Sequence, residues 1–212
     1  MAASVGKKLV RIDARIDTVC PWCFVGKKNL DKAIDASKDQ YDFEIKYHPF
    51  QLEPDAPKEG VEKREHYRRK FGPQVERMQD RMSEVFRNLG LEYKYSGLTG
   101  NTLDSHRLIY FAGQQGPDKQ HNLVEELCTG YFTQEKYIGD REFLVEAANK
   151  AGVQGAAEFL QDPNNGLREV KEELEQYTPA GVPFYVINDG KQKLSGAQPP
   201  EVFLKAFKIA SD

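Results

Sequence analysis

Two cysteines three positions apart are the part of this sequence best suited to chemistry. Cys20 and Cys23 enclose Pro21 and Trp22, where an alternating, strand-like stretch gives way to a helical one. Residues i and i+3 of an α-helix lie one turn apart, with Cα atoms about 5 Å from each other. A disulfide needs Cα atoms roughly 4.4–6.8 Å apart. The spacing therefore predicts a cysteine pair that forms and breaks a disulfide with little movement of the backbone.

The two cysteines are expected to have different roles. The first turn of a helix carries unpaired N–H groups and about half a positive charge, which favours a thiolate there. Cys20, at the helix end and facing solvent, is predicted to be the attacking thiolate, and Cys23, one turn farther in, the resolving thiol. Pro21 suits the first turn because its missing N–H would have no partner in any case.

A zinc half-site and a chance spacing are the other interpretations of this pair. Structural zinc sites normally have four ligands. The sequence has no second Cys-x-x-Cys, and Cys128 and the four histidines offer no matching spacing. We therefore expect no metal and no bound cofactor, with a redox-active disulfide between Cys20 and Cys23 as the working group.

The stretches around the cysteines predict a strand–helix–strand unit. Residues 9–17 alternate between apolar and charged side chains, residues 20–37 have helical periodicity, and residues 42–50 alternate again. A strand, a helix and a second strand in one short stretch form a βαβ unit, whose strands are parallel.

The rest of the chain divides into a helical middle and a strand-rich end. Residues 183–195 predict two strands joined by a tight turn, and a helix follows from Pro199, which gives a ββα end. Residues 55–177 have helical periodicity almost throughout. The sequence thus predicts one α/β domain, formed by residues 1–54 and 178–212, that is interrupted by a helical insertion.

Composition excludes several classes of protein. Of the 212 residues, 39% are hydrophobic and 30% are charged, and the net charge is −3 at pH 7, so no nucleic acid is expected as a partner. No window approaches the ~18 consecutive apolar residues of a membrane helix, so no membrane association is expected. The first residues lack the pattern of an export signal, and three cysteines are too few for a disulfide scaffold. We expect a cytoplasmic monomer or homodimer.

The cysteine motif also carries a family resemblance. The chain resembles the FrnE-like branch of the DsbA family, in the thioredoxin superfamily, at residues 17–27 (DTVCPWCFVGK), 101–107 (NTLDSHR), 131–132 (YF), 181–184 (GVPF) and 195–199 (SGAQP). These matches run over nearly the whole chain in the expected order. The resemblance implies a thioredoxin-like fold (βαβ plus ββα) interrupted by a large all-helical insertion. It also implies thiol–disulfide oxidoreductase activity on protein or small-molecule substrates.

The same resemblance implies site residues beyond the two cysteines. Pro183 is implied to be a cis-proline that faces the cysteines, and an extended ligand would pair with the backbone of Val182 beside it. Pro21 and Trp22 complete the implied substrate-binding set. Trp22, the only tryptophan, is expected to be a half-exposed platform rather than an ordinary core residue.

One position departs from the family. Thioredoxins and DsbA keep an acid six residues before the first cysteine, where this chain has Ala14. Asp17 is the nearest acid, so the sequence leaves open which group takes the proton from Cys23. His106 is either a helper in proton transfer or an ordinary polar residue near a helix start. Asn101 is a candidate for ligand contacts.

Two further features have simple interpretations. Cys128 lies on the apolar stripe of a predicted helix, so we expect a buried, inert thiol, with a regulatory second disulfide as the alternative. The charged residues 62–70 are expected to form a solvated helix face.

Two other functions stay open. Kappa-class glutathione transferases and hydroxychromene-carboxylate isomerases are similar overall, but they have a serine where Cys20 stands and they activate glutathione. This makes glutathione a candidate co-substrate here. A binding module that keeps the motif only for structure is the other alternative. The intact cysteine pair favours the oxidoreductase, and a reducing compartment favours a reductase or isomerase over net oxidation.

Overall fold

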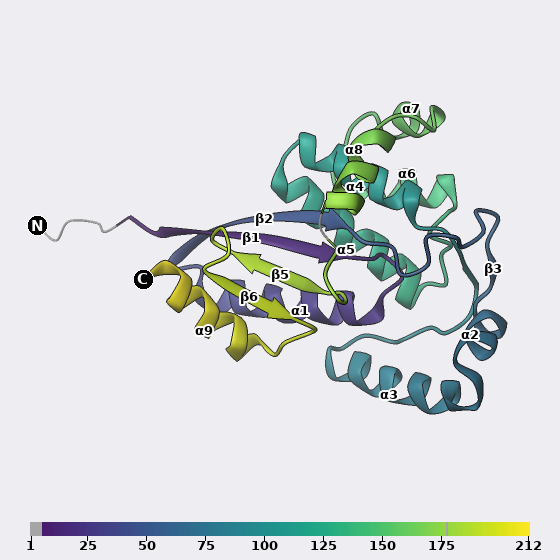
Figure 1. Cartoon of the computed structure of the whole chain (residues 1–212), viewed down its shortest axis with the longest axis horizontal. Coiled ribbons are helices and arrows are strands. Elements are labelled where there is room, and N and C mark those ends of the chain that lie inside the picture. Colours follow the sequence, from purple (N-terminus) through teal and green to yellow (C-terminus); the bar gives the residue numbers. More distant parts are fainter. Residues whose placement is uncertain (1–5, 177) are drawn as a thin grey trace, which may run out of the picture.

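A four-stranded mixed sheet forms the centre of the molecule (Figure 1). The computed structural model describes residues 6–176 and 178–212; residues 1–5, part of the stretch on which the expectation about an export signal rests, and residue 177 lie outside it. The strands are β1 (Lys8–Ile16), β2 (Tyr41–Pro49), β5 (Phe184–Ile187) and β6 (Gln192–Ser195), in the order β2-β1-β5-β6. β1 is parallel to β2 and antiparallel to β5, and β5 pairs antiparallel with β6. The predicted βαβ unit and C-terminal hairpin are thereby confirmed.

Two helices cover one face of this sheet. They are α1 (Pro21–Ser37) and α9 (Pro200–Ser211), which lie side by side in Figure 1. Each begins with a proline at its first position, where the missing N–H costs no hydrogen bond. The apolar side of α9 is fully buried through Phe203 and Phe207. α1 starts at the end of the sheet that faces the remaining helices, so its first turn lies next to those helices.

Residues 61–176, here called the helical segment, lie between β2 and β5. Its helices are α2 (Lys63–Phe71), α3 (Val75–Asn88), α4 (Leu103–Gln114), α5 (Pro117–Thr133), α6 (Arg141–Lys150), α7 (Ala156–Gln161) and α8 (Leu167–Gln176). A 3₁₀ turn at Gly72–Gln74 separates α2 from α3. The segment is not purely helical, because β3 (Val61–Glu62) pairs with β4 (Leu98–Thr99). Strands of two residues are too short to show alternation, so the sequence could not predict this pair.

An aromatic cluster fixes the helical segment against the start of α1. The Phe24 ring on α1 lies 5.9 Å from that of Phe86 on α3 and 5.8 Å from that of Phe132 on α5. All three side chains are buried. Aromatic pairs at such distances contribute roughly 0.5–1.5 kcal/mol beyond the burial of their area. The cluster therefore holds α3 and α5 beside the cysteine motif.

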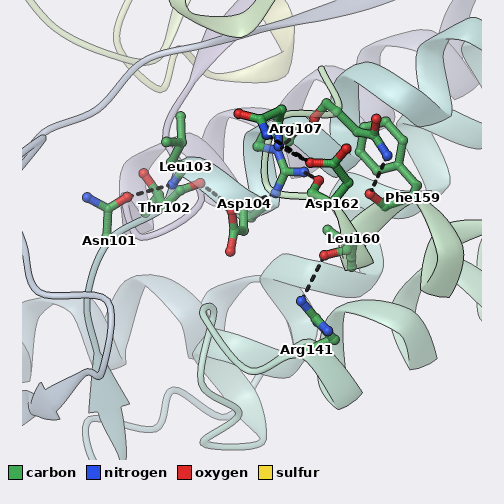
Figure 2. Close-up of polar contacts among 12 residues, drawn as sticks. Asn101, Thr102, Leu103, Asp104, Arg107, Arg141, Phe159, Leu160 and Asp162 are labelled. Atoms are coloured by element: carbon green, nitrogen blue, oxygen red, sulfur yellow. Dashed lines mark hydrogen bonds and ion pairs between the residues drawn. The ribbon is translucent and has the colours of Figure 1, made fainter. Parts of the chain in front are cut away.

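A buried arginine connects α4 to the chain between α7 and α8 (Figure 2). The Arg107 guanidinium donates to the carbonyl oxygen of Asn165 at 2.7 Å and to the carboxylate of Asp104 at 2.8 Å, and it also donates to the carbonyl of Asp162. Nearby, Arg141 on α6 donates to the carbonyl of Leu160 at the end of α7.

Within residues 6–176 and 178–212, none of the helices combines the length and the apolar composition needed to span a bilayer.

Candidate active site

The cysteine motif occupies the first turn of α1. Cys20 is the N-cap residue, and its Sγ accepts a hydrogen bond from the backbone N–H of Cys23 at 3.3 Å. Both thiols are free in this structure. The predicted placement of the pair at a helix N-terminus is confirmed, and the atom expected to react is also the atom that caps the helix.

Both cysteines are buried, which differs from the expectation that Cys20 faces solvent. The exposed fraction is 5% for Cys20 and 2% for Cys23. Cys20 borders a cavity of about 300 Å³, whereas Cys23 is not among the residues that line it. The helical segment, which the cysteine motif alone could not place, covers the end of α1. Cys20 is therefore reached through a cavity rather than from an open surface.

The environment of Cys23 favours the protonated thiol. Burial raises its pKa well above the usual value, and a hydrogen bond with Cys20 and the charges of Cys20 and Asp17 raise it further. A hydrogen bond with the backbone of Asp17 acts in the opposite direction and is outweighed. Cys23 thus needs assistance before it can act as a thiolate nucleophile.

The chain just before β5 lies against the cysteine motif. The Val182–Pro183 peptide bond is cis. The Cys20 thiol lies 3.9 Å from the carbonyl oxygen of Val182, at the outer limit of a hydrogen bond from sulfur. A Cβ added to Gly26 would lie 3.1 Å from Cγ of Pro183, so the proline ring packs directly on α1. Residues about 160 positions apart, Cys20 and Val182, are thereby brought together.

Asp17 and His106 form a buried pair beside the motif. The Asp17 carboxylate accepts hydrogen bonds from the backbone N–H groups of Thr18 at 2.9 Å and Leu52 at 2.8 Å. Nε2 of His106 lies 3.1 Å from the same carboxylate, and both side chains are almost fully buried. The carbonyl of Asp17 in turn accepts from the N–H of Cys20. The pair therefore holds the loop that leads into α1.

Asn101 stabilises a loop. Its amide donates to the carbonyl oxygens of Pro54 at 2.9 Å and Ala56 at 3.2 Å. Its Oδ1 accepts from the N–H of Leu103, at the start of α4 (Figure 2). The cavity beside Cys20 is lined by its neighbours Gly100 and Thr102, and Asn101 is not among the lining residues.

The cavity beside Cys20 has aromatic and methionine walls with a few charged groups. Its lining includes Trp22, Tyr67, Met78, Met82, Tyr93 and Phe132. Trp22 is half-buried, and the guanidinium of Arg81 on α3 lies 5.7 Å from its ring centre. Trp22 is thus partly exposed, as expected, and it borders the cavity with its ring next to Arg81 of α3.

Lys63 is a site residue that the sequence did not indicate. We expected residues 62–70 to form a solvated helix face, but Lys63 is 2% exposed and lines the cavity. Its Nζ lies 3.7 Å from the ring centre of Tyr131 and donates to the Tyr131 carbonyl at 3.4 Å. Burial lowers the pKa of Lys63 to about 8. Within residues 6–176 and 178–212, no carboxylate forms an ion pair with it.

Cys128 lies on α5 with an exposed fraction of 1%, as expected for a buried thiol. Burial raises its pKa. A protonated thiol without access to solvent is a poor nucleophile, so the structure supports the inert interpretation of Cys128.

Comparison with known proteins identifies the family. A family model described as the DSBA-like thioredoxin domain matches residues 11–208. The chain belongs to the DsbA-like family of thiol–disulfide oxidoreductases. This DsbA-like protein therefore has the thioredoxin-like fold that the sequence resemblance implied.

Individual relatives agree with this assignment. The probable DsbA oxidoreductase SCO1869 from Streptomyces coelicolor matches the DsbA-like protein with a TM-score of 0.83 and 31% identity, over 95% of this chain and 89% of that one. The cytosolic disulfide reductase DsbM from Pseudomonas aeruginosa matches with a TM-score of 0.61 and 16% identity, over 92% and 97%, a likeness of fold alone. The uncharacterized protein YwbO from Bacillus subtilis is 25% identical over 210 residues, 93% of this chain and 96% of its own.

Proposed function

We propose that this DsbA-like protein exchanges disulfides through Cys20 and Cys23. The observation that carries the proposal is the arrangement of two free thiols on one helical turn, with Cys20 beside a cavity and Cys23 behind it. The Cys20 thiolate attacks a substrate disulfide, forms a mixed disulfide and releases one substrate thiolate. Cys23 then attacks Cys20 Sγ, forms the Cys20–Cys23 disulfide and releases the second substrate thiol. Two electrons pass to the substrate, and the reverse sequence oxidises a dithiol.

The proposed substrate surface consists of Trp22 and Pro21 on one side and of Val182 and Pro183 on the other. The contact between the Cys20 thiol and the Val182 carbonyl supports this assignment, because an extended ligand reaching Cys20 would lie along the same backbone. Asp17 and His106 are proposed as positioning residues, since their contacts hold the loop before Cys20. Asn101 is proposed to position the loop through its own contacts.

Glutathione is the proposed small-molecule co-substrate. The cavity of about 300 Å³ suits a short thiol peptide better than a folded protein. Lys63 supplies a buried cation without an ion-pair partner among the described residues, and a carboxylate is its natural complement. The Pseudomonas aeruginosa protein DsbM has also been solved with GSH. With a cytoplasmic location, which stays a prediction, the net direction would be reduction of substrate disulfides.

Two cysteine variants test the mechanism. In an insulin-disulfide reduction assay, Cys20→Ser should abolish activity, whereas Cys23→Ser should accumulate a mixed disulfide that mass spectrometry detects. Cys128→Ser is the matched control, because its thiol is buried away from the cavity lining, and it should retain activity. Full activity of Cys20→Ser would exclude the mechanism. Undiminished turnover of Cys23→Ser with glutathione would instead support a glutathione transferase or isomerase.

A variant of Lys63 tests the co-substrate. Lys63→Met should raise the KM for glutathione disulfide and leave the KM for hydroxyethyl disulfide, which has no carboxylate, almost unchanged. Lys70→Met is the control, because Lys70 also lines the cavity but already pairs with Glu53. Equal changes for both disulfides would argue against a carboxylate contact with Lys63.

A further inference from the structure

Tyr185 carries a buried hydroxyl that has no hydrogen-bond partner among the described residues. Its side chain is 1% exposed and stands on β5, two residues after Pro183. Buried side-chain oxygens are nearly always hydrogen-bonded, because an unpaired one loses its contacts with water and gains none in return. An unpaired buried hydroxyl requires an explanation. One explanation is that its hydrogen-bond partner is present only in another chemical state of the protein.

The Tyr185 hydroxyl lies beneath the first turns of α1. A Cβ added to Gly26 would come within 3.0 Å of it, closer than real Cβ contacts allow. Gly26 follows Cys23 by three residues, so the two share one face of the helix at about 5–6 Å from each other. Burial, followed by the charges of Cys23 and Cys20, raises the pKa of Tyr185 well above its usual value. The hydroxyl and the two sulfurs therefore lie within electrostatic reach of each other.

The strand next to Tyr185 offers no competing polar group. Ala14 on β1 is the Cα partner of Tyr185 across the β1–β5 pair, and it is completely buried. Partners in register project from the same face of a sheet, and the methyl group of Ala14 carries no polar atom there. The edge of that ring also packs against Phe203 on α9, with ring centres 5.0 Å apart, which fixes its direction.

We propose that the Tyr185 hydroxyl donates a hydrogen bond to the Cys23 thiolate, directly or through one water, as Cys23 attacks the mixed disulfide. The inference rests on the proposed function. In this step the Cys23–Cys20 bond forms and the bond between Cys20 and the substrate sulfur breaks. The electron pair leaves on the substrate sulfur, which takes up the proton that Cys23 has released. Tyr185 keeps its own proton throughout, in agreement with its raised pKa.

Other titratable groups also surround this step. They are Cys20 and Asp31 on α1, Asp17 after β1 with its partner His106 on α4, and Cys128 on α5. In the reduced protein the charges of Cys20 and Asp17 raise the pKa of Cys23, and the hydrogen bond with the Asp17 backbone lowers it by less. A neutral donor on β5 adds stabilisation of the Cys23 thiolate that the charged groups do not supply.

Tyr185→Phe tests the inference because it removes only the hydroxyl. Reduced protein mixed with Ellman's reagent should release one coloured thiolate when Cys20 attacks and a second when Cys23 resolves the mixed disulfide. In Tyr185→Phe the first phase should be unchanged and the second about tenfold slower, the effect of one hydrogen bond to a charged group. The pH midpoint of the second phase should rise by about one unit. Thermal unfolding should show no loss of stability, because the hydroxyl has no partner to lose.

Tyr95→Phe is the matched control. The Tyr95 hydroxyl is also buried without a partner in the described part of the chain, but its ring stacks on Tyr67 on α2. Its second phase should equal that of the wild type, and Tyr185→Met, a second variant without the hydroxyl, should be slowed like Tyr185→Phe. A wild-type protein that releases only the first thiolate would overturn the proposed function. Two normal phases in Tyr185→Phe at every pH, or equal slowing in Tyr95→Phe, would overturn the inference alone.

Discussion

His48 on β2 and Glu173 on α8 join the central sheet to the last helix of the helical segment. Nδ1 of His48 lies 2.6 Å from Oε2 of Glu173, and Nε2 lies 2.7 Å from Oδ1 of Asp13 on β1. One imidazole therefore bridges two carboxylates from different elements. Because the bridge is strongest when the ring is protonated, the attachment of α8 to the sheet depends on pH.

We expect the contribution of His48 to stability to fall as the pH rises above neutrality. Burial alone lowers the pKa of His48, but hydrogen bonds with Asp13 and Glu173, together with their charges, outweigh burial and the pKa is raised. A raised folded-state pKa means that the stabilisation is complete below about pH 6.5 and is lost as the pH rises through the folded-state value. In urea unfolding, the stability difference between the wild type and His48→Gln should shrink from about pH 6 to about pH 9. A difference that is the same at the two pH values would contradict the assignment.

Gly26→Ala should destabilise the protein although it lies inside a helix. On an unobstructed helix this change stabilises by about 0.5–1 kcal/mol. Here the new Cβ would meet the Tyr185 hydroxyl and Cγ of Pro183, so we expect a net loss of roughly 1–3 kcal/mol in urea unfolding. Combining Gly26→Ala with Tyr185→Phe should recover part of that loss, since one of the two obstructions is removed. A Gly26→Ala protein as stable as the wild type would show that Tyr185 and Pro183 can move away from the new Cβ without loss of stability.

The stability of the wild type should rise with pH in the range where Lys63 titrates. Burial lowers the pKa of Lys63 to about 8, although the charges of Glu135 and Glu62 oppose the shift. An unfolded lysine titrates near 10.4, so between these values the unfolded chain binds more protons and folding is favoured as the pH rises. Lys63→Met should remove this rise and increase stability at neutral pH by roughly 1–3 kcal/mol. An unchanged pH profile in thermal unfolding would contradict the assignment of Lys63.

Trp22 fluorescence should report the redox state of the cysteine pair. Trp22 is the only tryptophan in the chain and stands between the two cysteines, so the signal has a single source. Formation of the disulfide converts the two free thiols on either side of Trp22 into one covalent S–S link beside the indole ring. The emission spectrum should therefore differ between oxidised and reduced protein, and Cys23→Ser should abolish the difference. Identical spectra of the two states would count against an active couple.

The sequence could predict those elements whose pattern is local. The alternation along β1 and β2, Pro21 at the start of α1 and the turn before β6 each depend on neighbouring residues, and the structure agrees closely with them. These features follow from periodicity and capping chemistry alone.

The parts that the sequence could not predict depend on contacts between distant residues. Asp17 and His106 are 89 positions apart, and no local pattern indicates that one binds the other. Lys63 belongs to a charged run, and only the packing of α2 against α5 places it over Tyr131, 68 positions away. Burial of Cys20 likewise depends on the helical segment that covers it. Periodicity describes one element at a time and does not show which elements meet.

The cavity beside Cys20 takes its walls and its reacting atoms from different stretches of the chain. Cys20, Trp22 and Val182 come from the sheet-bearing part, whereas most of the lining, including Lys63, Tyr93 and Phe132, comes from residues 52–132. Substitutions in these helices would therefore change the cavity wall and leave the proposed chemistry of Cys20 and Cys23 in place. The shape of the wall can accordingly be redesigned around an unchanged Cys-Pro-Trp-Cys turn.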